Sequence, residues 1–233
     1  MPDETPLSIH HPERPAVGGV VVIQEIFGVS DHIEDVCQRI AQVGWLAVAP
    51  HLFWRTGDPV VATDDYGTAL EHTGKLTRES ILEDVDAALA YIQDAGIPLD
   101  AAGIVGFCAG GSIAFAVATE RPIAAAVTYY GGGITEPRFG FAPMAEAAPG
   151  LTVPWLGLYG DLDQSIPSDQ VDLLADAAAQ AEVNTEVIRY ADAGHAFNRD
   201  GGPTYEPASA EDAWRRMLDW FADNLTTGAT ETI

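Results

Sequence analysis

The residues with the clearest capacity for chemistry are a cysteine framed by glycines, an aspartate and a histidine, in that order along the chain. Cys108 stands within the sequence GFCAG at residues 106–110, directly after a short apolar stretch. Such a pattern at a strand-to-helix junction is typical of a nucleophile elbow, where a sharp turn exposes the nucleophile and small neighbours permit the bend. The alternative is a buried cysteine that packs as a small hydrophobic residue.

A catalytic cysteine needs two partners, and the chain offers both downstream. A thiol attacks an acyl carbon as the thiolate, so it needs a base, and an imidazole base needs an acid that fixes its tautomer. Asp161 and Asp163 follow the expected strand 153–160, and His195 follows the expected strand 185–190. We favour Asp163 as the acid, because Asp161 directly follows a glycine and suits closure of the turn. A surface histidine is the alternative interpretation of His195.

The elements that must position these residues alternate between strand and helix, which predicts a mostly parallel sheet covered by helices on both faces. Nucleophile, acid and histidine then lie beyond the carboxyl ends of strands, in the chain order of the α/β-hydrolase fold. The short N-terminal segment leaves little room for the antiparallel strands that often open this fold. We expect strands at 18–23, 45–49, 104–105, 123–129, 153–160 and 185–190, helices at 31–43, 78–95, 112–118, 168–180 and 210–224, and irregular stretches at 51–66 and 131–150.

The length of 233 residues suits one α/β-hydrolase domain over 1–233, with a core at about 17–222 and a frayed tail at 226–233. No apolar run approaches the ~18 residues of a membrane span. The acidic residues 1–5 lack the pattern of a signal peptide. Two cysteines, of which Cys37 fits the core face of a helix, argue against a disulfide framework. These features predict a cytoplasmic protein.

The formal net charge of −24 is extreme for a chain of this length. A field of this sign repels nucleic acid and anionic membranes, so we exclude both as partners. Lys75 is the only lysine. Dense like charge destabilises a compact state unless salt screens it, and the acidity therefore favours adaptation to high salt. An ordinary acidic protein is the alternative.

Five short motifs, taken together, resemble the dienelactone hydrolase family. They are QEIFG at 24–28, GFCAGG at 106–111, YYG at 129–131, DQSIP at 163–167 and AGH at 193–195. The resemblance extends from about residue 17 to residue 222. The first two motifs are specific when they occur in one chain. The resemblance implies an α/β-hydrolase fold and hydrolysis of a lactone or ester.

The resemblance also implies roles for individual residues. Cys108 corresponds to the nucleophile, His195 to the base and Asp163 to the acid. Glu25 corresponds to a buried carboxylate near the thiol, and the backbone N–H groups of Ile26 and Ala109 to the oxyanion hole. Arg199 corresponds to an arginine that binds the substrate carboxylate, and Tyr129 to a residue of the substrate site.

Physical chemistry supports two of these roles less sharply. A carboxylate directly after a buried strand, such as Glu25, is costly unless it has a partner or a function, and a structural hydrogen bond is the alternative. Arg199 follows His195 by four residues, and a guanidinium binds a carboxylate bidentately, although an ordinary surface arginine is the alternative. The family's second substrate-binding arginine has no counterpart within residues 56–77, since Arg55 and Arg78 only flank that segment.

These observations predict a hydrolase that cleaves a small lactone or ester through a Cys-His-Asp triad and a thioester intermediate, and the resemblance at Arg199 extends the expected substrates to anionic ones. We expect no cofactor, and we assign no metal because His32, His51 and His72 have no metal-ligand spacing. One alternative is a general small-ester carboxylesterase on the same scaffold. The others are a non-catalytic binding protein and a redox-responsive thiol protein.

Overall fold

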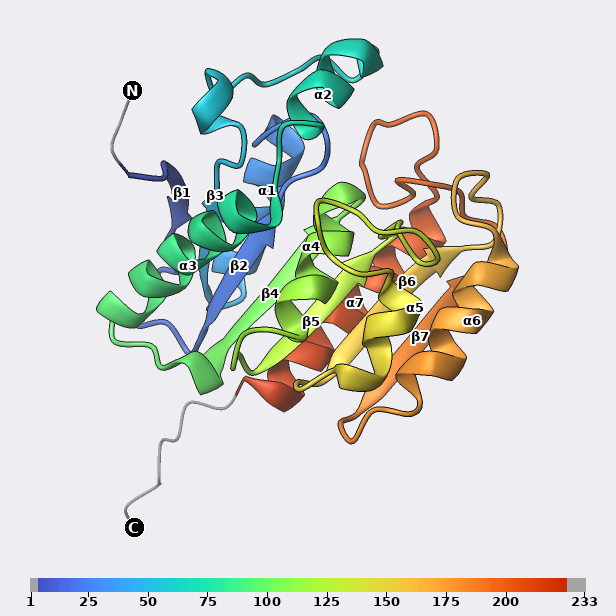
Figure 1. Cartoon of the computed structure of the whole chain (residues 1–233). Helices are drawn as coiled ribbons and strands as arrows, with labels where there is room; N and C mark the ends of the chain where they lie inside the picture. Colours follow the sequence, from blue (N-terminus) through green and yellow to red (C-terminus); the bar gives the residue numbers. More distant parts are fainter. Residues whose placement is uncertain (1–3, 226–233) are drawn as a thin grey trace.

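A single mixed sheet forms the centre of the molecule. The computed structural model describes residues 4–225, and its seven strands follow the order β1-β3-β2-β4-β5-β6-β7 (Figure 1). All strands from β2 to β7 run parallel, whereas β1 pairs antiparallel with β3 at one edge. The strands are β1 (Leu7–His10), β2 (Gly19–Ile23), β3 (Leu46–Pro50), β4 (Ala102–Phe107), β5 (Ala125–Tyr129), β6 (Trp155–Gly160) and β7 (Thr185–Tyr190).

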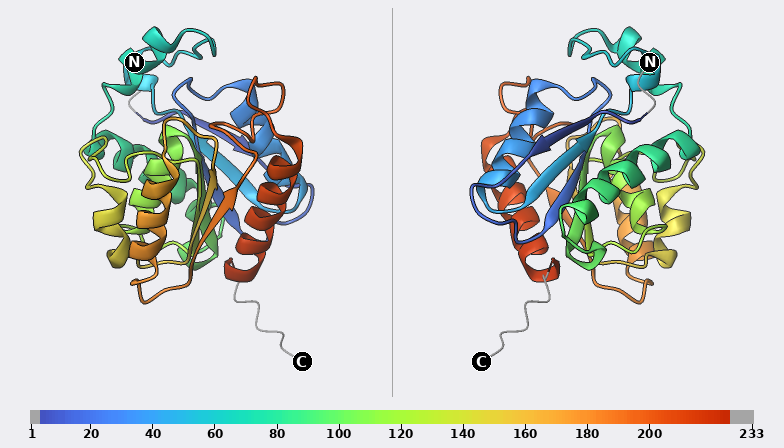
Figure 2. Two further views of the ribbon diagram at one scale, coloured as in Figure 1. Left: turned by 90° about the vertical axis from the view of Figure 1, so that its right-hand side faces the viewer. Right: turned by 90° about the vertical axis from the view of Figure 1, so that its left-hand side faces the viewer.

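Helices cover both faces of this sheet, as the two side views in Figure 2 show. The arrangement confirms the predicted parallel sheet between two helical layers. One face carries α1 (Asp31–Gln42) and α7 (Pro207–Asn224), and the other carries α3 (Arg78–Asp94), α4 (Ala109–Ala118) and α6 (Ser168–Ala178). Shorter elements are α2 (Tyr66–Thr73), α5 (Met144–Ala147), η1 (Trp54–Thr56), η2 (Leu99–Ala101) and η3 (Ala148–Gly150).

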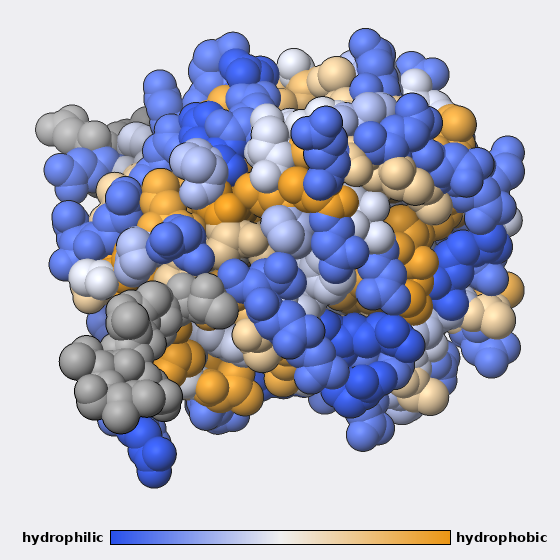
Figure 3. Space-filling view, turned by 90° about the horizontal axis from the view of Figure 1, so that it is seen from below, coloured by the Kyte–Doolittle hydropathy of each residue, from blue (hydrophilic) through white to orange (hydrophobic). Residues whose placement is uncertain are grey.

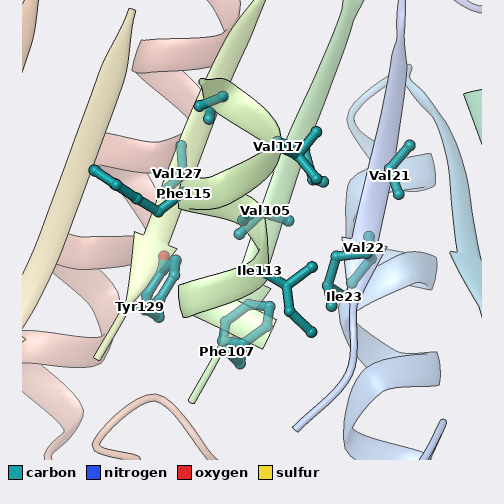
Figure 4. Close-up of a cluster of buried hydrophobic side chains, with 14 of the residues drawn as sticks. Val21, Val22, Ile23, Val105, Phe107, Ile113, Phe115, Val117, Val127 and Tyr129 are labelled. Carbon is teal, nitrogen blue, oxygen red and sulfur yellow. The ribbon is translucent and has the colours of Figure 1, made fainter. Parts of the chain in front are cut away.

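The core is most continuous where α4 packs on β2, β4 and β5 (Figure 4). Every residue of these three strands and of α4 is buried. Strands covered on both faces are apolar at successive positions rather than at alternate ones, which explains the runs VVVI and AGIVGF. The strand that leads to Cys108 is therefore shielded from solvent on both faces.

Two expectations about the elements differ from the structure. The N-terminal segment does contain an antiparallel strand, because the four residues of β1 suffice to pair with β3. Helix α2 was not expected, since no element was assigned between the irregular stretch 51–66 and the helix from residue 78; its first turn is capped by the Asp65 side chain, which accepts a hydrogen bond from the Thr68 amide. The tail expected to fray, 226–233, lies outside the described residues.

The surface of the molecule is largely polar. In the view of Figure 3, hydrophilic residues occupy much of the face, and hydrophobic residues are interspersed among them. Across residues 4–225, no helix has both the length and the apolar character needed to cross a membrane. The carboxyl ends of the parallel strands lie at the opposite end of the sheet from this view, and the candidate site lies there.

Candidate active site

Cys108 lies on a strained turn between β4 and α4. Its backbone has φ 56° and ψ −116°, a region that non-glycine residues rarely adopt. The turn also depends on two glycines. A Cβ on Gly106 would lie 1.9 Å from the Gly110 carbonyl oxygen, and a Cβ on Gly110 would lie 2.5 Å from the Ile23 carbonyl oxygen. The main chain thus packs against itself here, and the predicted elbow geometry is present.

The three residues expected to form a triad lie together. The Sγ atom of Cys108 is 3.2 Å from Nε2 of His195. On the other side of the ring, Nδ1 of His195 is 2.6 Å from Oδ2 of Asp163. Asp161, the alternative acid, instead pairs with Arg189 at 2.6 Å. The arrangement allows the imidazole to take a proton from the thiol while the carboxylate orients the ring.

The Asp163 carboxylate is fixed by its own loop. Its Oδ1 atom accepts hydrogen bonds from the Ser165 amide at 2.8 Å, the Ser165 hydroxyl at 2.6 Å and the Ile166 amide at 3.2 Å. Burial by itself raises the pKa of Asp163, but the hydrogen bonds from His195 and Ser165 outweigh it and lower that pKa. Ser165 was not singled out from the sequence, although an aspartate followed two residues later by a serine is a common turn pattern.

His195 is predisposed to carry a proton. Burial by itself lowers its pKa, but the hydrogen bonds to Asp163 and Cys108 reverse this effect and raise the pKa of His195 to about 10. The electrostatic attraction of the two neighbouring groups acts in the same direction. A protonated His195 would stabilise a thiolate at Cys108 once the thiol has lost its proton, and the thiolate is the nucleophilic form.

Glu25 and Arg199 form a buried ion pair beside the triad. Nη2 of Arg199 donates a hydrogen bond to Oε2 of Glu25, and the exposed fractions of the two side chains are 13% for Arg199 and 2% for Glu25. The guanidinium carbon of Arg199 also lies 4.7 Å from the centre of the Phe27 ring. The buried carboxylate therefore has the partner that its position demands.

Ile26 and Ala109 lie beside the nucleophile. Both residues belong to a small apolar cluster that also contacts Cys108, together with Phe27, Val61, Ala69 and Phe139. Among the main-chain hydrogen bonds between loops and turns of residues 4–225, neither amide is a donor. The turn after β2 is held by Gln24, whose Oε1 accepts a hydrogen bond from the Leu52 amide at 3.0 Å. The two amides thus remain available for an oxyanion.

The structure separates the two tyrosines of the YYG motif. Tyr129 is the last residue of β5, and its ring stacks on Phe107 in the core at 4.7 Å. Burial raises the pKa of the Tyr129 hydroxyl. The other groups that act on this pKa are those of Tyr190, Arg39 and Asp212, which belong to β7, α1 and α7 and not to the triad. The expected substrate role of Tyr129 therefore has no support in this geometry.

Tyr130 lies beside the triad instead. Its φ is 39°, so the chain turns after β5 and brings the ring to 5.2 Å from the ring of His195. Its hydroxyl is buried and has no hydrogen-bond partner among the described residues. Burial raises the pKa of Tyr130, and the charges of Glu25 and Cys108 raise it further. Within the motif, only the break in strand geometry distinguishes this tyrosine from its neighbour.

His32 lies near the Glu25–Arg199 pair, although the sequence led us to consider it only as a metal ligand and to set that role aside. It occupies the first turn of α1, and its ring meets Phe107 edge to face at 5.8 Å. Burial lowers the pKa of His32, Glu25 raises it and Arg199 lowers it. The buried Glu25–Arg199 pair is thus close enough for its charges to shift the pKa of the His32 imidazole.

The two arginines that flank the gap in the resemblance are engaged elsewhere. Arg55 pairs with Glu83 at 2.9 Å and with the buried Asp84 at 2.8 Å. Arg78 pairs with Glu120 at 2.5 Å. Neither arginine contacts Cys108, Asp163 or His195 through an ion pair or a hydrogen bond. Among the described residues, Arg199 is therefore the one cationic side chain that contacts Glu25.

Comparison with protein families agrees with these features. A family model described as the dienelactone hydrolase family matches residues 7–225. A protein of Escherichia coli strain K12, provisionally named a carboxymethylenebutenolidase, is 42% identical over 205 residues, covering 87% of this chain and 75% of the relative. A protein of Synechocystis with the same provisional name is 32% identical over 217 residues, covering 88% and 86% of the two chains.

Solved structures extend the comparison to the fold. A crystal structure of a provisionally named dienelactone hydrolase from Klebsiella pneumoniae superposes with a TM-score of 0.86 at 38% identity, covering 94% of this chain and 92% of that one. The metagenomic enzyme P91, titled a dienelactone hydrolase-like promiscuous phosphotriesterase, has a TM-score of 0.77 at 23% identity, with coverage of 94% and 92%. At that identity the likeness concerns the fold alone. The predicted α/β-hydrolase fold is confirmed.

Proposed function

We propose a mechanism for this chain on the premise that it belongs to the dienelactone hydrolase family and is therefore a hydrolase of carboxylic esters or lactones. In this mechanism Cys108 is the nucleophile, His195 the general base and acid, and Asp163 the group that orients His195. The observation that carries the proposal is the 3.2 Å contact between Sγ of Cys108 and Nε2 of His195, at an elbow with positive φ. A cysteine that only filled the core would need neither feature.

The chemistry divides into two acyl transfers. The Cys108 thiolate attacks the carbonyl carbon, and the amides of Ile26 and Ala109 stabilise the negative oxygen of the tetrahedral intermediate. The carbon–oxygen bond of the ester then breaks, His195 protonates the departing alkoxide, and a thioester remains. In a lactone the alcohol stays attached to the acyl group. Water, deprotonated by His195, attacks the thioester, and the carbon–sulfur bond breaks to release the acid and restore the thiolate.

The Glu25–Arg199 pair supports an anionic substrate. A carboxylate on the substrate would compete with Glu25 for the Arg199 guanidinium, because both anions suit the same planar donor group. Glu25, once displaced, would be an unpaired buried carboxylate and hence a base strong enough to take a proton from the thiol. Substrate binding and activation of Cys108 would then be coupled, and the resting thiol would be protected from stray electrophiles.

A general small-ester carboxylesterase is the second candidate. It is favoured because, within residues 4–225, Arg55 and Arg78 are both engaged by carboxylates outside the triad and neither is free to serve as a second substrate-binding arginine. In that case His195 alone activates Cys108. The two candidates differ in whether a substrate carboxylate accelerates the reaction.

The test of the mechanism uses lactones and short-chain esters, with and without a carboxylate, on the wild-type protein and on Cys108→Ala. Hydrolysis should fall to background in the variant while the melting temperature stays close to that of the wild type. Iodoacetamide should abolish activity and label Cys108 before Cys37, which is fully buried. Cys37→Ala is the matched control and should keep activity and its inhibition.

Three results would contradict the mechanism. Near-full activity in Cys108→Ala would remove the cysteine from the chemistry. Absence of turnover on every activated ester would favour a binding protein that retains the pocket, and reversible oxidation of Cys108 by mild peroxide without hydrolysis would favour a redox-responsive thiol.

A further inference from the structure

A cavity lies beside α4, and it is lined by Ser112, which stands one helical turn after the nucleophile. Its volume is about 270 Å³, close to the lower end of the roughly 300–1,000 Å³ typical of small-molecule sites. It is enclosed by α4, by the start of α3 and by the loop between β5 and α5, which passes over α4 in Figure 1. Ser112 lines the cavity, and its amide donates to the Cys108 carbonyl at 3.4 Å. Cys108, Asp163 and His195 do not line it.

The cavity combines an apolar floor with a cationic rim. Phe115, Phe141 and Met144 supply aromatic and thioether surface. The charged residues of its lining are Arg78, Glu120 and Arg138, so their charges sum to one positive. Arg78 and Glu120 neutralise each other as an ion pair at 2.5 Å. The positive charge that remains is that of Arg138.

Arg138 is exceptional among the cations of this acidic chain. Of the 11 lysines and arginines, all but Arg14 and Arg138 form an ion pair with a carboxylate within the described residues. Acidic side chains outnumber cationic ones threefold, with 35 against 11. An arginine that forms no ion pair within residues 4–225 is available to pair with an anion from solution.

The Arg138 side chain lies along the wall of the cavity, over Gly132 and Gly133. Its Nη1 atom lies 2.9 Å from the point that a Cβ on Gly132 would occupy, and Gly132 is a lining residue. The residue opens a two-residue turn, in which Phe139 and Gly140 have φ of 55° and 83° and Arg138 and Phe141 exchange main-chain hydrogen bonds at 3.2 and 2.8 Å. Turns of this type are well defined, so the guanidinium is presented by a preformed loop.

We propose that this cavity is a second binding site, for a small organic carboxylate with an apolar or aromatic body. The carboxylate pairs with Arg138, and the body packs on Phe115, Phe141 and Met144. Phe139 separates the site from the catalytic residues, since it lines the cavity and also packs against the small apolar cluster that contacts Cys108. The proposal does not depend on the mechanism of hydrolysis.

Phenylacetate is a suitable probe, and its neutral isostere phenylacetamide is the ligand control. Titration into ¹⁵N-labelled wild-type protein should give saturable shifts of the Gly132, Gly133 and Gly140 amides. The Kd should be millimolar or tighter, as expected of about ten non-hydrogen atoms at the efficiency of small ligands. Phenylacetamide should bind at least about 10-fold more weakly, since it lacks the charge that Arg138 attracts.

Three variants locate the carboxylate. Arg138→Gln should weaken phenylacetate binding at least about 10-fold. Arg14 is the other cation without an ion pair among the described residues, and it borders a different hollow. Arg14→Gln should therefore leave phenylacetate binding unchanged. Ala142→Trp, at the exposed rim of the cavity, should block binding without changing the melting temperature. The proposal is overturned if the wild-type protein gives no saturable shifts. It is also overturned if the shifts centre on Phe27 and Asn198 and disappear in Arg199→Gln but not in Arg138→Gln.

Discussion

At the scale of single residues, the two cysteines show how one side chain acquires different chemistry from its surroundings. Cys37 has no exposed surface, and burial strongly raises the pKa of its thiol. Cys108 is only partly buried and lies 3.2 Å from an imidazole. The same thiol group is therefore inert packing in α1 and a candidate nucleophile at the elbow.

Arg199 should discriminate between charged and neutral substrates. In Arg199→Ala, kcat/KM for a carboxylate-bearing lactone should fall by ~10- to 1000-fold, about 1.4–4 kcal/mol, because the anion loses its guanidinium partner. A neutral ester should lose much less. Glu25→Gln should also slow the anionic substrate while the circular dichroism spectrum stays unchanged. Equal losses on both substrates would reject the coupling and favour the simple esterase.

The contact between His195 and Asp163 should stabilise the fold in a defined pH range. The pKa of His195 is raised from its ordinary value of 6.5 to about 10. A group with a raised pKa contributes its full stabilisation below the lower value and loses it as the pH rises through the higher one. The melting temperature of the wild type should therefore exceed that of His195→Gln at pH 6, and the difference should shrink by pH 10.5. A constant difference would contradict the protonated histidine.

At the scale of elements, the elbow depends on the close approach of α4 to β4 and β2. Gly106→Ala places a Cβ 1.9 Å from the Gly110 carbonyl oxygen, so the main chain must move. We expect a loss of at least about 1–3 kcal/mol in the free energy of unfolding, measured by urea titration. Gly150→Ala is the control, because a Cβ there meets no atom within 4 Å, and it should change stability by less than about 0.5 kcal/mol. Equal effects of both substitutions would show that the elbow tolerates a side chain.

The elements that the sequence predicted well are those with the strongest apolar periodicity. The strand before Cys108 and the helix from Asp31 are examples, since burial on both faces or on one stripe leaves a direct mark on residue type. Helix α2 was missed because its apolar face is short, and it is fixed by the cap from Asp65. The formation of such short helices depends on individual contacts, such as a cap, more than on the composition of the segment.

The candidate site was predictable to the extent that strand ends determine it. Cys108, Asp163 and His195 follow β4, β6 and β7, and parallel strands bring such positions to one edge. The choice between Tyr129 and Tyr130 was not predictable, because it depends on one positive φ at Tyr130. The cavity at Arg138 arises from tertiary packing of a loop on α4, for which the sequence has no periodic signal.

At the scale of the whole molecule, like charge dominates. The net charge of −24 opposes compaction, and salt screens this repulsion over distances of about 10 Å at 0.1 M and about 3 Å at 1 M. The melting temperature should therefore rise by at least about 5 °C between ~0.1 M and ~2 M KCl, or roughly 1–3 kcal/mol for a chain of this size. Surface ion pairs, at about 0–1 kcal/mol each, weaken over the same range and only partly offset the gain.

The control for the salt prediction is a neutral osmolyte of matched osmolality, which should have a smaller effect because it does not screen charge. A flat dependence on KCl would reject salt adaptation and leave plain acidity. The polar surface seen in Figure 3 fits either outcome.

The pairing of Glu25 with Arg199 has a consequence for how the chain folds. The two residues are 174 positions apart, and Cys108 and His195 are 87 apart. Closing loops of this length is entropically costly and slow, so such contacts form only after the intervening strands have found their order. During refolding, the return of catalysis should coincide with docking of the segment after β7, later than the recovery of helical signal. The recovery of hydrolytic activity would thus report the rate of the last folding step.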